Sequence, residues 1–237
     1  MIPRNNLELY LRIVILQEKS MFPDLSHMPV TYGCCLLIAA VSIIAFYYKP
    51  LFRALIFHPY EFFRGKRQHA IFTSGLIHNS WWHLAMNIYF FYRANRDIEY
   101  IILEERFSVA AISCISIFII ISGIIVPNFI VGSWKKSEIA FTSVGFSGAV
   151  FSTLGFSLLY LPIDHPAKPY KLVPMYYAYE FAIVLAIVLI GLFVTFRRTG
   201  TNHAVHLLGL FNGFIIAIIL RPELVKELSS HIYARVI

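Results

Sequence analysis

Six long apolar stretches limit what this chain can fold into. Each is close to the roughly 17 to 25 residues that cross a hydrocarbon core as an α-helix. The uncharged windows run from Thr31 to Tyr48, Ala70 to Tyr92, Phe107 to Val131, Ile139 to Ile163, Phe181 to Phe196 and Thr199 to Leu220. With only 14% of its residues charged, the chain has too little polar material to cover a soluble domain of its size. We therefore expect an all-α membrane protein, a single bundle of six transmembrane helices.

The windows divide the chain into one membrane domain and two short ends. We expect residues 1–30 to form a cytosolic or interfacial segment, residues 31–220 the six-helix domain, and residues 221–237 a short tail. The apolar run from Leu9 to Leu16 is interrupted by Arg12, which predicts an amphipathic surface segment rather than a cleavable signal peptide. The loop from Pro50 to His69 mixes aromatic with basic residues, so we expect it to lie in the headgroup region beside the bundle.

The formal charge of +7 does not indicate a nucleic-acid partner, because the Lys and Arg residues are scattered in ones and twos rather than forming a stripe. A basic membrane protein beside anionic headgroups explains the charge, so the lipid bilayer is the expected partner. The three cysteines, Cys34, Cys35 and Cys114, lie inside apolar windows, where a thiol usually acts as a small hydrophobe. No disulfide framework is expected.

Side chains of the kinds that serine hydrolases use lie near the starts of the second, fourth and sixth windows. Ser147 lies in the fourth window, His206 in the sixth, and His78, His83 and Asn87 in the second. Because successive spans alternate in direction, these three helix starts share one leaflet. Polar groups are costly in lipid, so their shared position indicates chemistry. A serine hydroxyl needs a base to remove its proton, and His is the side chain best matched to that task near neutral pH.

Small residues predict close packing of the fourth and sixth helices, because they let helix backbones approach each other in lipid. They recur at helical spacing in both segments: Gly148, Ser152 and Gly155 in the fourth, and Gly209 and Gly213 after His206 in the sixth. Such contact would bring the Ser147 hydroxyl within hydrogen-bonding reach of the His206 imidazole. Phe151, one turn after Ser147, is placed to pack on that ring and hold its orientation.

The expected catalytic group is a Ser–His dyad, because none of the 13 acidic residues lies in these three windows. Packing would then do the orienting that Asp does in the usual triad. The oxyanion of the tetrahedral intermediate needs donors aimed at it in a low-dielectric site. Our candidates are the backbone N–H of Ser147, the His83 ring and the Asn87 amide, the last two lying four residues apart on one helix face.

Two other classes of function are weaker alternatives. Four imidazoles, those of His78, His83, His203 and His206, are candidates for a metal or haem site, but no Cys or carboxylate joins them at ligand spacing. Polar residues inside a membrane also mark transport paths, but the two halves of the chain show no matching interrupted helices. We expect no metal and no cofactor.

Together, three motifs resemble those of the rhomboid intramembrane serine proteases. The motif His-x4-His-x3-Asn is met by His78, His83 and Asn87, Gly-x-Ser-Gly by Gly145, Ser147 and Gly148, and His-x2-Gly-x3-Gly by His206, Gly209 and Gly213. They occur in the family's order and on its second, fourth and sixth helices. Phe151 stands where the family often has an aromatic residue against the catalytic His. The resemblance covers about Thr31 to Leu220.

The resemblance implies a six-helix rhomboid-like bundle with cytosolic termini that cleaves transmembrane substrates near their luminal ends. It also implies that Ser147 is the nucleophile, that His206 is the base, and that His83 and Asn87 lie at the oxyanion. The run from Val144 to Gly148 and the bare six-helix layout look most like the rhomboid-related subgroup of the endoplasmic reticulum. That likeness implies a location in the endoplasmic reticulum or early secretory pathway.

Two points qualify the resemblance. Many members carry Trp-Arg in the first loop, eight to nine residues before the first motif His, whereas this chain has His69 and Ala70 there. We therefore expect a different anchoring of that loop. The alternative within the family is a non-proteolytic relative that binds unstable transmembrane helices and hands them on. Inactive members of the family usually lack the catalytic Ser or His, and both residues are present in this chain.

Overall fold

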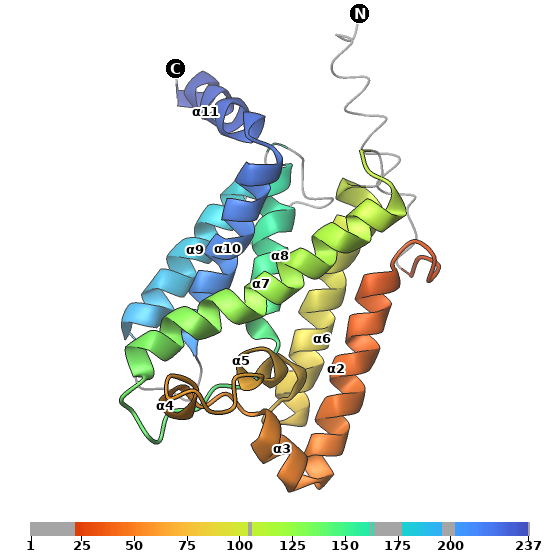
Figure 1. The fold of residues 1–237 in the computed structure, drawn as a ribbon. Helices are drawn as coiled ribbons and strands as arrows, with labels where there is room; N and C mark the ends of the chain where they lie inside the picture. Colours follow the sequence, from red (N-terminus) through yellow and green to blue (C-terminus); the bar gives the residue numbers. More distant parts are fainter. Residues whose placement is uncertain (1–21, 104–105, 162, 164–176, 196–201, 237) are drawn as a thin grey trace, which may run out of the picture.

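The computed structural model describes residues 22–103, 106–161, 163, 177–195 and 202–236, which are mostly helical (Figure 1). The elements in chain order are α2 (Pro29–Tyr47), α3 (Lys49–Leu55), α4 (Pro59–Phe62), α5 (Ala70–Thr73), the 3₁₀ turn η1 (Ser74–Leu76), α6 (Trp81–Arg96), the π-helical η2 (Asp97–Ile102), α7 (Val109–Lys135), α8 (Ser147–Tyr160), α9 (Ala178–Thr195), α10 (His203–Leu220) and α11 (Glu223–Val236). The segment Leu9 to Leu16, expected to be amphipathic, lies outside the described residues.

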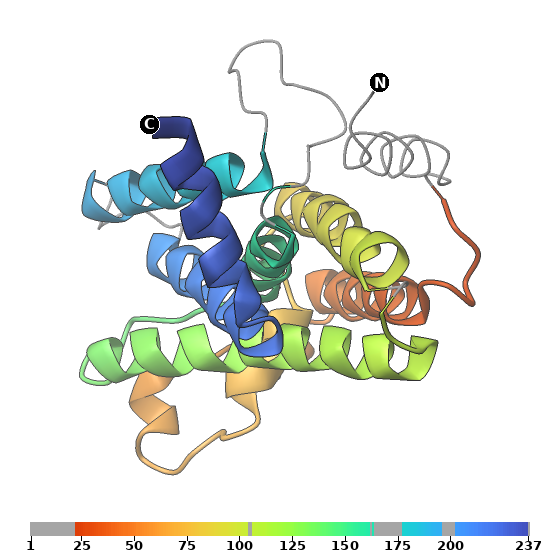
Figure 2. The same cartoon turned by 90° about the horizontal axis from the view of Figure 1, so that it is seen from above.

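Helix α8 lies at the centre of the bundle and is surrounded by the other long helices (Figure 2). It contacts α6, α7, α9 and α10, and its most extensive contact is with α10. Helix α7 crosses one side of the bundle obliquely, with α4 and α5 packed against it, while α3 lies at the foot of α2 (Figure 1). The chain segments that carry the three motifs are therefore neighbours in space.

Two clusters of apolar side chains hold α8 in place. Toward its C-terminal end, Phe156 and Tyr160 are almost fully buried and pack with Ile216 of α10 in one cluster. Toward its N-terminal end, Ala149 packs with Phe91 of α6 in the other. The large apolar side chains on the outer faces of α2, α7, α9 and α10 are exposed instead, as expected of surfaces that contact lipid.

The expected all-helical membrane architecture is confirmed, but six membrane crossings are not. Within the described residues, α2, α7, α9 and α10 are long and apolar enough to cross a bilayer. Helices α6 and α8 fall in the second and fourth predicted windows but contain only 16 and 14 residues. Both windows were wrong at their starts, because residues 70–76 form α5 and η1 and residues 139–146 form no helix.

Local chemistry explains both late starts. The Ser80 hydroxyl accepts a hydrogen bond from the His83 backbone N–H at 3.2 Å, which caps the first turn of α6. Before α8, Gly145 has a φ of +116°, a conformation that L-residues with a side chain rarely adopt and that no helix contains. Helix α6 therefore begins only after Ser80, and helix α8 only after Gly145.

The segment between α2 and α6 is anchored by Arg67. Its guanidinium donates to the carbonyl oxygens of Arg53, Ala54 and Ile56 at the end of α3, the last two at 3.1 and 3.0 Å. It also forms an ion pair with Glu61 at 3.0 Å. Carbonyls at a helix C-terminus have no partner within the helix, and a cation satisfies them well. An arginine thus does anchor this segment, although not at the position where the resemblance places one.

The start of α2 is tied to η2, the continuation of α6, through Glu99, which is only 2% exposed. Its carboxylate accepts hydrogen bonds from the backbone N–H groups of Val30 and Thr31 at 3.2 and 2.8 Å, from the Thr31 hydroxyl, and from the Asn95 amide. A carboxylate at a helix N-terminus interacts favourably with the helix dipole. The contact fixes the antiparallel pair α2 and α6 at the end of the bundle opposite Ser147.

Candidate active site

Ser147 is the first residue of α8 and follows a sharp turn of the backbone. The Gly145 N–H donates to the Ser74 carbonyl oxygen at 2.9 Å, which joins the segment before α8 to η1. The Phe146 side chain, only 2% exposed, is buried beneath the turn. The backbone leading to Ser147 is therefore held from two sides, and the Ser147 side chain itself is half-buried.

Helices α8 and α10 pack with their backbones in contact. A Cβ atom at Gly209 of α10 would lie 2.5 Å from the Gly148 carbonyl oxygen, and one at Gly213 would collide with the Ser152 carbonyl oxygen. A Cβ atom at Gly148 would lie 3.2 Å from Cγ1 of Val205. Only glycine allows this approach. Because Gly148 follows Ser147 and Val205 precedes His206, the two predicted catalytic residues lie at the same helix contact.

The His206 ring stacks on the Phe151 ring, with centroids 4.6 Å apart and an angle of 26° between the planes. This contact is the one that the spacing of Phe151 from Ser147 predicts. Among the described residues, however, no hydrogen bond joins the Ser147 hydroxyl to the His206 ring. The structure thus brings the two helices together without forming the expected Ser–His hydrogen bond. Such bonds are often loose in enzymes without substrate.

His78 connects the backbone before Ser147 to α2. Its Nε2 atom accepts a hydrogen bond from the Phe146 N–H at 3.3 Å, so Nδ1 carries the proton and donates to the Ser42 hydroxyl at 2.9 Å. The Ser42 hydroxyl in turn donates to the Leu76 carbonyl oxygen at 3.0 Å. His78 is fully buried. This chain of bonds fixes its tautomer and indicates a positioning role, and Ser42 is a member that sequence reasoning missed.

His83 and Asn87 lie on one face of α6, as their spacing predicts. The His83 ring lies against Gly145, where a Cβ atom would come within 2.7 Å of ring atom Cε1. The Asn87 amide donates to the His83 carbonyl oxygen at 2.8 Å, which orients the amide and leaves its second N–H for another acceptor. The His83 ring, proposed as an oxyanion donor, therefore lies against Gly145, which is two residues before Ser147 along the chain.

A polar cluster on the far side of the α8–α10 contact was also missed by sequence reasoning. The Asn212 amide of α10 donates to the Ser122 hydroxyl of α7 at 3.0 Å and to the Ser152 hydroxyl of α8 at 2.9 Å. Ser152 is fully buried. An Asn in the middle of an apolar helix six residues after His206 was a signal that could have identified it. The cluster joins three helices just beneath the predicted catalytic pair.

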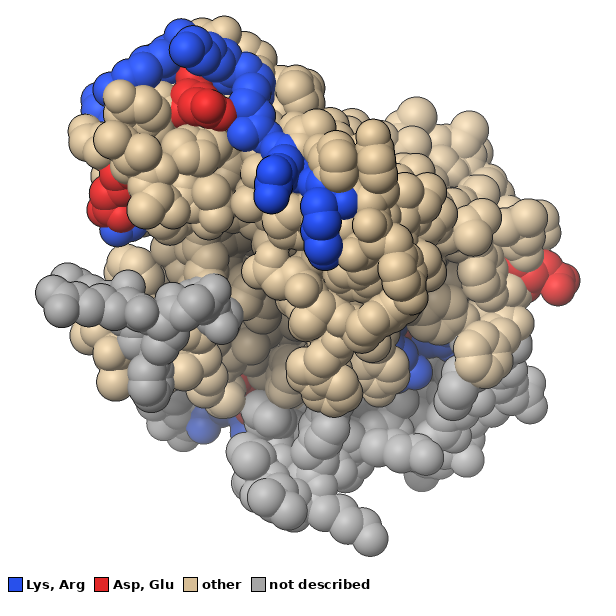
Figure 3. Space-filling view, turned by 90° about the horizontal axis from the view of Figure 1, so that it is seen from below, with Lys and Arg blue, Asp and Glu red and all other residues tan. Residues whose placement is uncertain are grey.

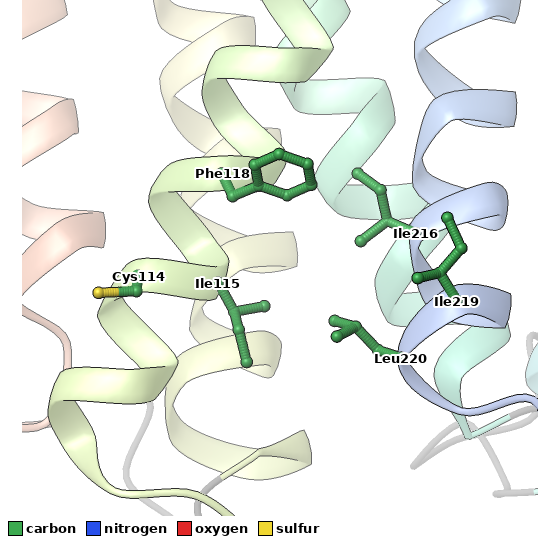
Figure 4. A pocket seen from close by; sticks show the side chains of 6 residues that line it. All are labelled: Cys114, Ile115, Phe118, Ile216, Ile219 and Leu220. Atoms are coloured by element: carbon green, nitrogen blue, oxygen red, sulfur yellow. The ribbon is translucent and has the colours of Figure 1, made fainter.

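Neither a metal cluster nor the cavity between α7 and α10 competes with this site. In the described ranges, no group of three or more His, Cys, Asp or Glu side chains is arranged to hold a metal ion. The cavity in Figure 4, about 300 Å³, lies between α7 and the C-terminal half of α10 and is lined by Cys114, Ile115, Phe118, Ile216, Ile219 and Leu220. It offers almost no polar groups and is more than two turns of α10 away from His206.

Comparison with known proteins identifies one family. A family model described as "Rhomboid domain" matches residues 65–223, more than half of the chain. The match includes the segments that carry all three motifs and the helices α6, α7, α8, α9 and α10. A search of curated proteins finds no match to the chain.

Proposed function

The chain belongs to the rhomboid family of integral membrane proteins, and we propose that it is an intramembrane serine endopeptidase acting on transmembrane protein substrates. Ser147 would attack the scissile carbonyl while His206 takes its proton and later returns it to the leaving amine. The backbone N–H of Ser147, the His83 ring and the Asn87 amide would stabilise the oxyanion. We include α6 and α8 as the second and fourth of six spans, as the family's layout requires.

The observation that carries this proposal is the glycine-mediated contact between α8 and α10. The approach of Gly209 to the Gly148 carbonyl sets Ser147 and His206 at one level of the bundle. The stacking of Phe151 on His206 supplies the orientation that an acidic residue gives in a triad. A base held by packing, next to a serine at a helix start, is what a dyad without a carboxylate requires.

Labelling by a fluorophosphonate probe and cleavage of a panel of single-span proteins test the proposal. Ser147→Ala should abolish labelling and lower cleavage by about 10³-fold or more, and His206→Ala should do the same. Ser157→Ala, a serine on the same helix, serves as the matched control and should label like the wild type. Unchanged cleavage in Ser147→Ala would remove Ser147 from the mechanism.

The alternative is a non-proteolytic rhomboid protein, since a dyad without a hydrogen bond between Ser147 and His206 is found in inactive proteins as well as in enzymes without substrate. A protein of that kind would retain transmembrane clients without cutting them. Co-purification of an intact single-span client with the wild type, together with absent fluorophosphonate labelling, would support this alternative. Labelling of the wild type with loss in Ser147→Ala would exclude it.

We also propose the endoplasmic-reticulum rhomboid-related subgroup, with a location in the endoplasmic reticulum or early secretory pathway. The support is the run from Val144 to Gly148. Imaging of a tagged chain against markers of successive secretory compartments tests this location. Accumulation at the plasma membrane or in mitochondria would contradict it.

A further inference from the structure

The face of the bundle around α3 to α5 carries a large excess of positive charge. Residues 49–69 and 135–138 contain seven basic side chains, Lys49, Arg53, Arg64, Lys66, Arg67, Lys135 and Lys136, and two acidic ones, Glu61 and Glu138. Figure 3 shows Lys and Arg side chains forming an arc across this face, with smaller acidic patches beside it. This surface therefore attracts anions.

Both acidic side chains on this face are already paired. Glu61 forms its ion pair with Arg67, and Glu138 forms one with Lys135 at 2.7 Å. Within the described chain, Arg64 and Lys136 have no carboxylate partner, and both are exposed. A zwitterionic ligand would find no free carboxylate here for its cation, so the charge balance favours a ligand with net negative charge.

Arg64 is held in place rather than extended into solvent. Its Nη1 atom donates to the carbonyl oxygens of Tyr60 at 2.8 Å and Lys136 at 3.3 Å. Its guanidinium lies 3.6 Å from the centre of the Tyr60 ring. This arrangement brings α4 next to the C-terminal end of α7 and sets the Arg64 cation beside the Lys136 backbone. A preorganised arginine of this kind suits recognition of a phosphate.

A cleft of about 260 Å³ lies at this junction, lined by Phe63, Arg64, Lys136 and Ser137. Its lining combines two cations and a hydroxyl with one aromatic ring. The Phe63 ring continues to the Phe129 ring of α7, with centroids 5.7 Å apart, and Phe129 is 49% exposed on the outer face of the helix. A polar cleft thus adjoins an apolar surface that extends along α7.

The depth of the cleft in the membrane follows from its neighbours. Trp134, two residues before Lys136, is 58% exposed, and indole rings favour the interface between headgroups and acyl chains. Farther along α7 from this end, Val126 and Phe118 are also exposed and are suited to contact with acyl chains. The cleft therefore lies at the level of lipid phosphates.

We propose that this cleft binds an anionic phospholipid, with the phosphate between Arg64 and Lys136 and an acyl chain along Phe63 and Phe129. The Ser137 hydroxyl donates to the headgroup. This proposal does not depend on proteolytic activity, because none of these residues belongs to the predicted catalytic group. Its occupant is a lipid rather than a free anion, because the cleft opens onto the apolar face of α7.

Quenching by brominated lipids of a tryptophan placed at position 129 tests the proposal on the full chain. Phe129→Trp is combined with Trp81→Phe, Trp82→Phe and Trp134→Phe, which remove the three native tryptophans, and the protein is reconstituted in phosphatidylcholine vesicles. Brominated phosphatidylglycerol should bind beside this tryptophan about tenfold more strongly than brominated phosphatidylcholine. Arg64→Ala or Lys136→Ala should each lower this preference by about fivefold, as expected for one cation near the membrane surface. Lys136→Arg should retain it.

The matched control is Arg53→Ala combined with Lys66→Ala, which removes two exposed cations of the same face from outside the cleft. The control should keep most of the preference, and an equal loss in the control would show diffuse attraction and overturn the site. Absence of any preference in the wild type would overturn it as well. Loss of the preference on adding millimolar inorganic phosphate would show a free-anion site and contradict a lipid occupant.

Native mass spectrometry gives a second measurement on the unaltered chain, independent of the tryptophan substitutions. The wild type released from mixed micelles should retain one phosphatidylglycerol more often than phosphatidylcholine, and Lys136→Ala should lose this bound lipid. Equal retention of both lipids by the wild type would contradict the proposal.

Discussion

His78 has both ring nitrogens hydrogen-bonded inside the bundle, and we predict that its loss loosens the segment before Ser147. His78→Ala leaves the Phe146 N–H and the Ser42 hydroxyl without their partner. Leaving buried polar groups unsatisfied costs about 1–3 kcal/mol, so thermal unfolding should begin at a lower temperature. Substrate cleavage should show a lower kcat with little change in KM. Ser42→Ala keeps the bond between His78 and the Phe146 N–H, so it should lower kcat less, while its loss of stability should be similar because the His78 Nδ1–H and the Leu76 carbonyl lose their partner.

Asn212 is a single side chain that joins three helices, and its coupling to each partner can be measured. Hydrogen bonds between helices in membranes contribute about 0.6 kcal/mol on average and about 1.7 kcal/mol at most. A double-mutant cycle of Asn212→Ala with Ser122→Ala should therefore give a coupling energy of about 0.5–1.5 kcal/mol in reversible detergent unfolding. The control cycle combines Asn212→Ala with Ser157→Ala. Asn212 does not hydrogen-bond to Ser157, so this cycle should give a coupling energy near zero. Equal coupling in both cycles would contradict the hydrogen bond.

At the scale of elements, the α8–α10 contact depends on glycine, whereas α9 offers a glycine without that constraint. Gly209→Ala forces a methyl group against the Gly148 carbonyl, so α10 must move away from α8. Overpacking of this kind typically costs about 1–3 kcal/mol, and cleavage should fall as His206 shifts. Gly191→Ala in α9 meets nothing within 4 Å and should leave stability unchanged or raise it by up to about 1 kcal/mol. Similar unfolding curves for the two variants would contradict this account.

The segment of α3 to α5 depends on Arg67 for its shape, and we predict that lysine cannot replace it. Arg67→Lys keeps the charge but loses the fork of donors that reaches the three carbonyls at the end of α3. Hydrogen exchange should therefore speed up at the Phe57 and Ser143 amides, which pair with each other's carbonyls at 3.1 and 3.0 Å. Arg53→Lys, at an exposed position on α3, is the control and should leave that exchange unchanged.

The sequence predicted the order and type of the elements but not where α6 and α8 begin. Hydropathy counts every apolar residue in residues 70–92, and it cannot separate a turn packed inside the protein from a spanning helix. Ser80 did offer a capping signal, since a serine before a helical run commonly accepts a backbone N–H. The positive φ of Gly145 depends on the His83 ring and on the Ser74 carbonyl, which come from elsewhere in the chain. No local pattern contains that information.

Contacts between residues distant in the sequence also explain which functional residues could be predicted and which could not. Motif spacing identified Ser147, His206 and Phe151, because each lies in a helix whose period relates neighbouring turns. Arg67 and Ser42 act through carbonyls and an imidazole distant in sequence, so periodicity carries no sign of them. The roles of the predicted catalytic residues remain predictions for the labelling experiment.

At the scale of the whole molecule, six spans require that α8, α9 and α10 together cross the bilayer three times. Ser137, before α8, and Ser229, in α11, are both exposed and should then lie on opposite sides of the membrane. We predict that a membrane-impermeant maleimide labels Ser137→Cys and Ser229→Cys from opposite sides in a background without Cys34, Cys35 and Cys114. Labelling of both from one side would show that one of the three helices does not cross.

The brevity of α8 has a consequence for the route by which water reaches the serine at its start. Its 14 residues correspond to about 21 Å, whereas the hydrocarbon core of a typical bilayer is about 30 Å thick. Because α6, α7, α9 and α10 enclose α8, these helices rather than lipid surround it. Water that hydrolyses a peptide bond at Ser147 must therefore pass between the neighbouring helices, and bulky side chains that fill this passage should slow hydrolysis.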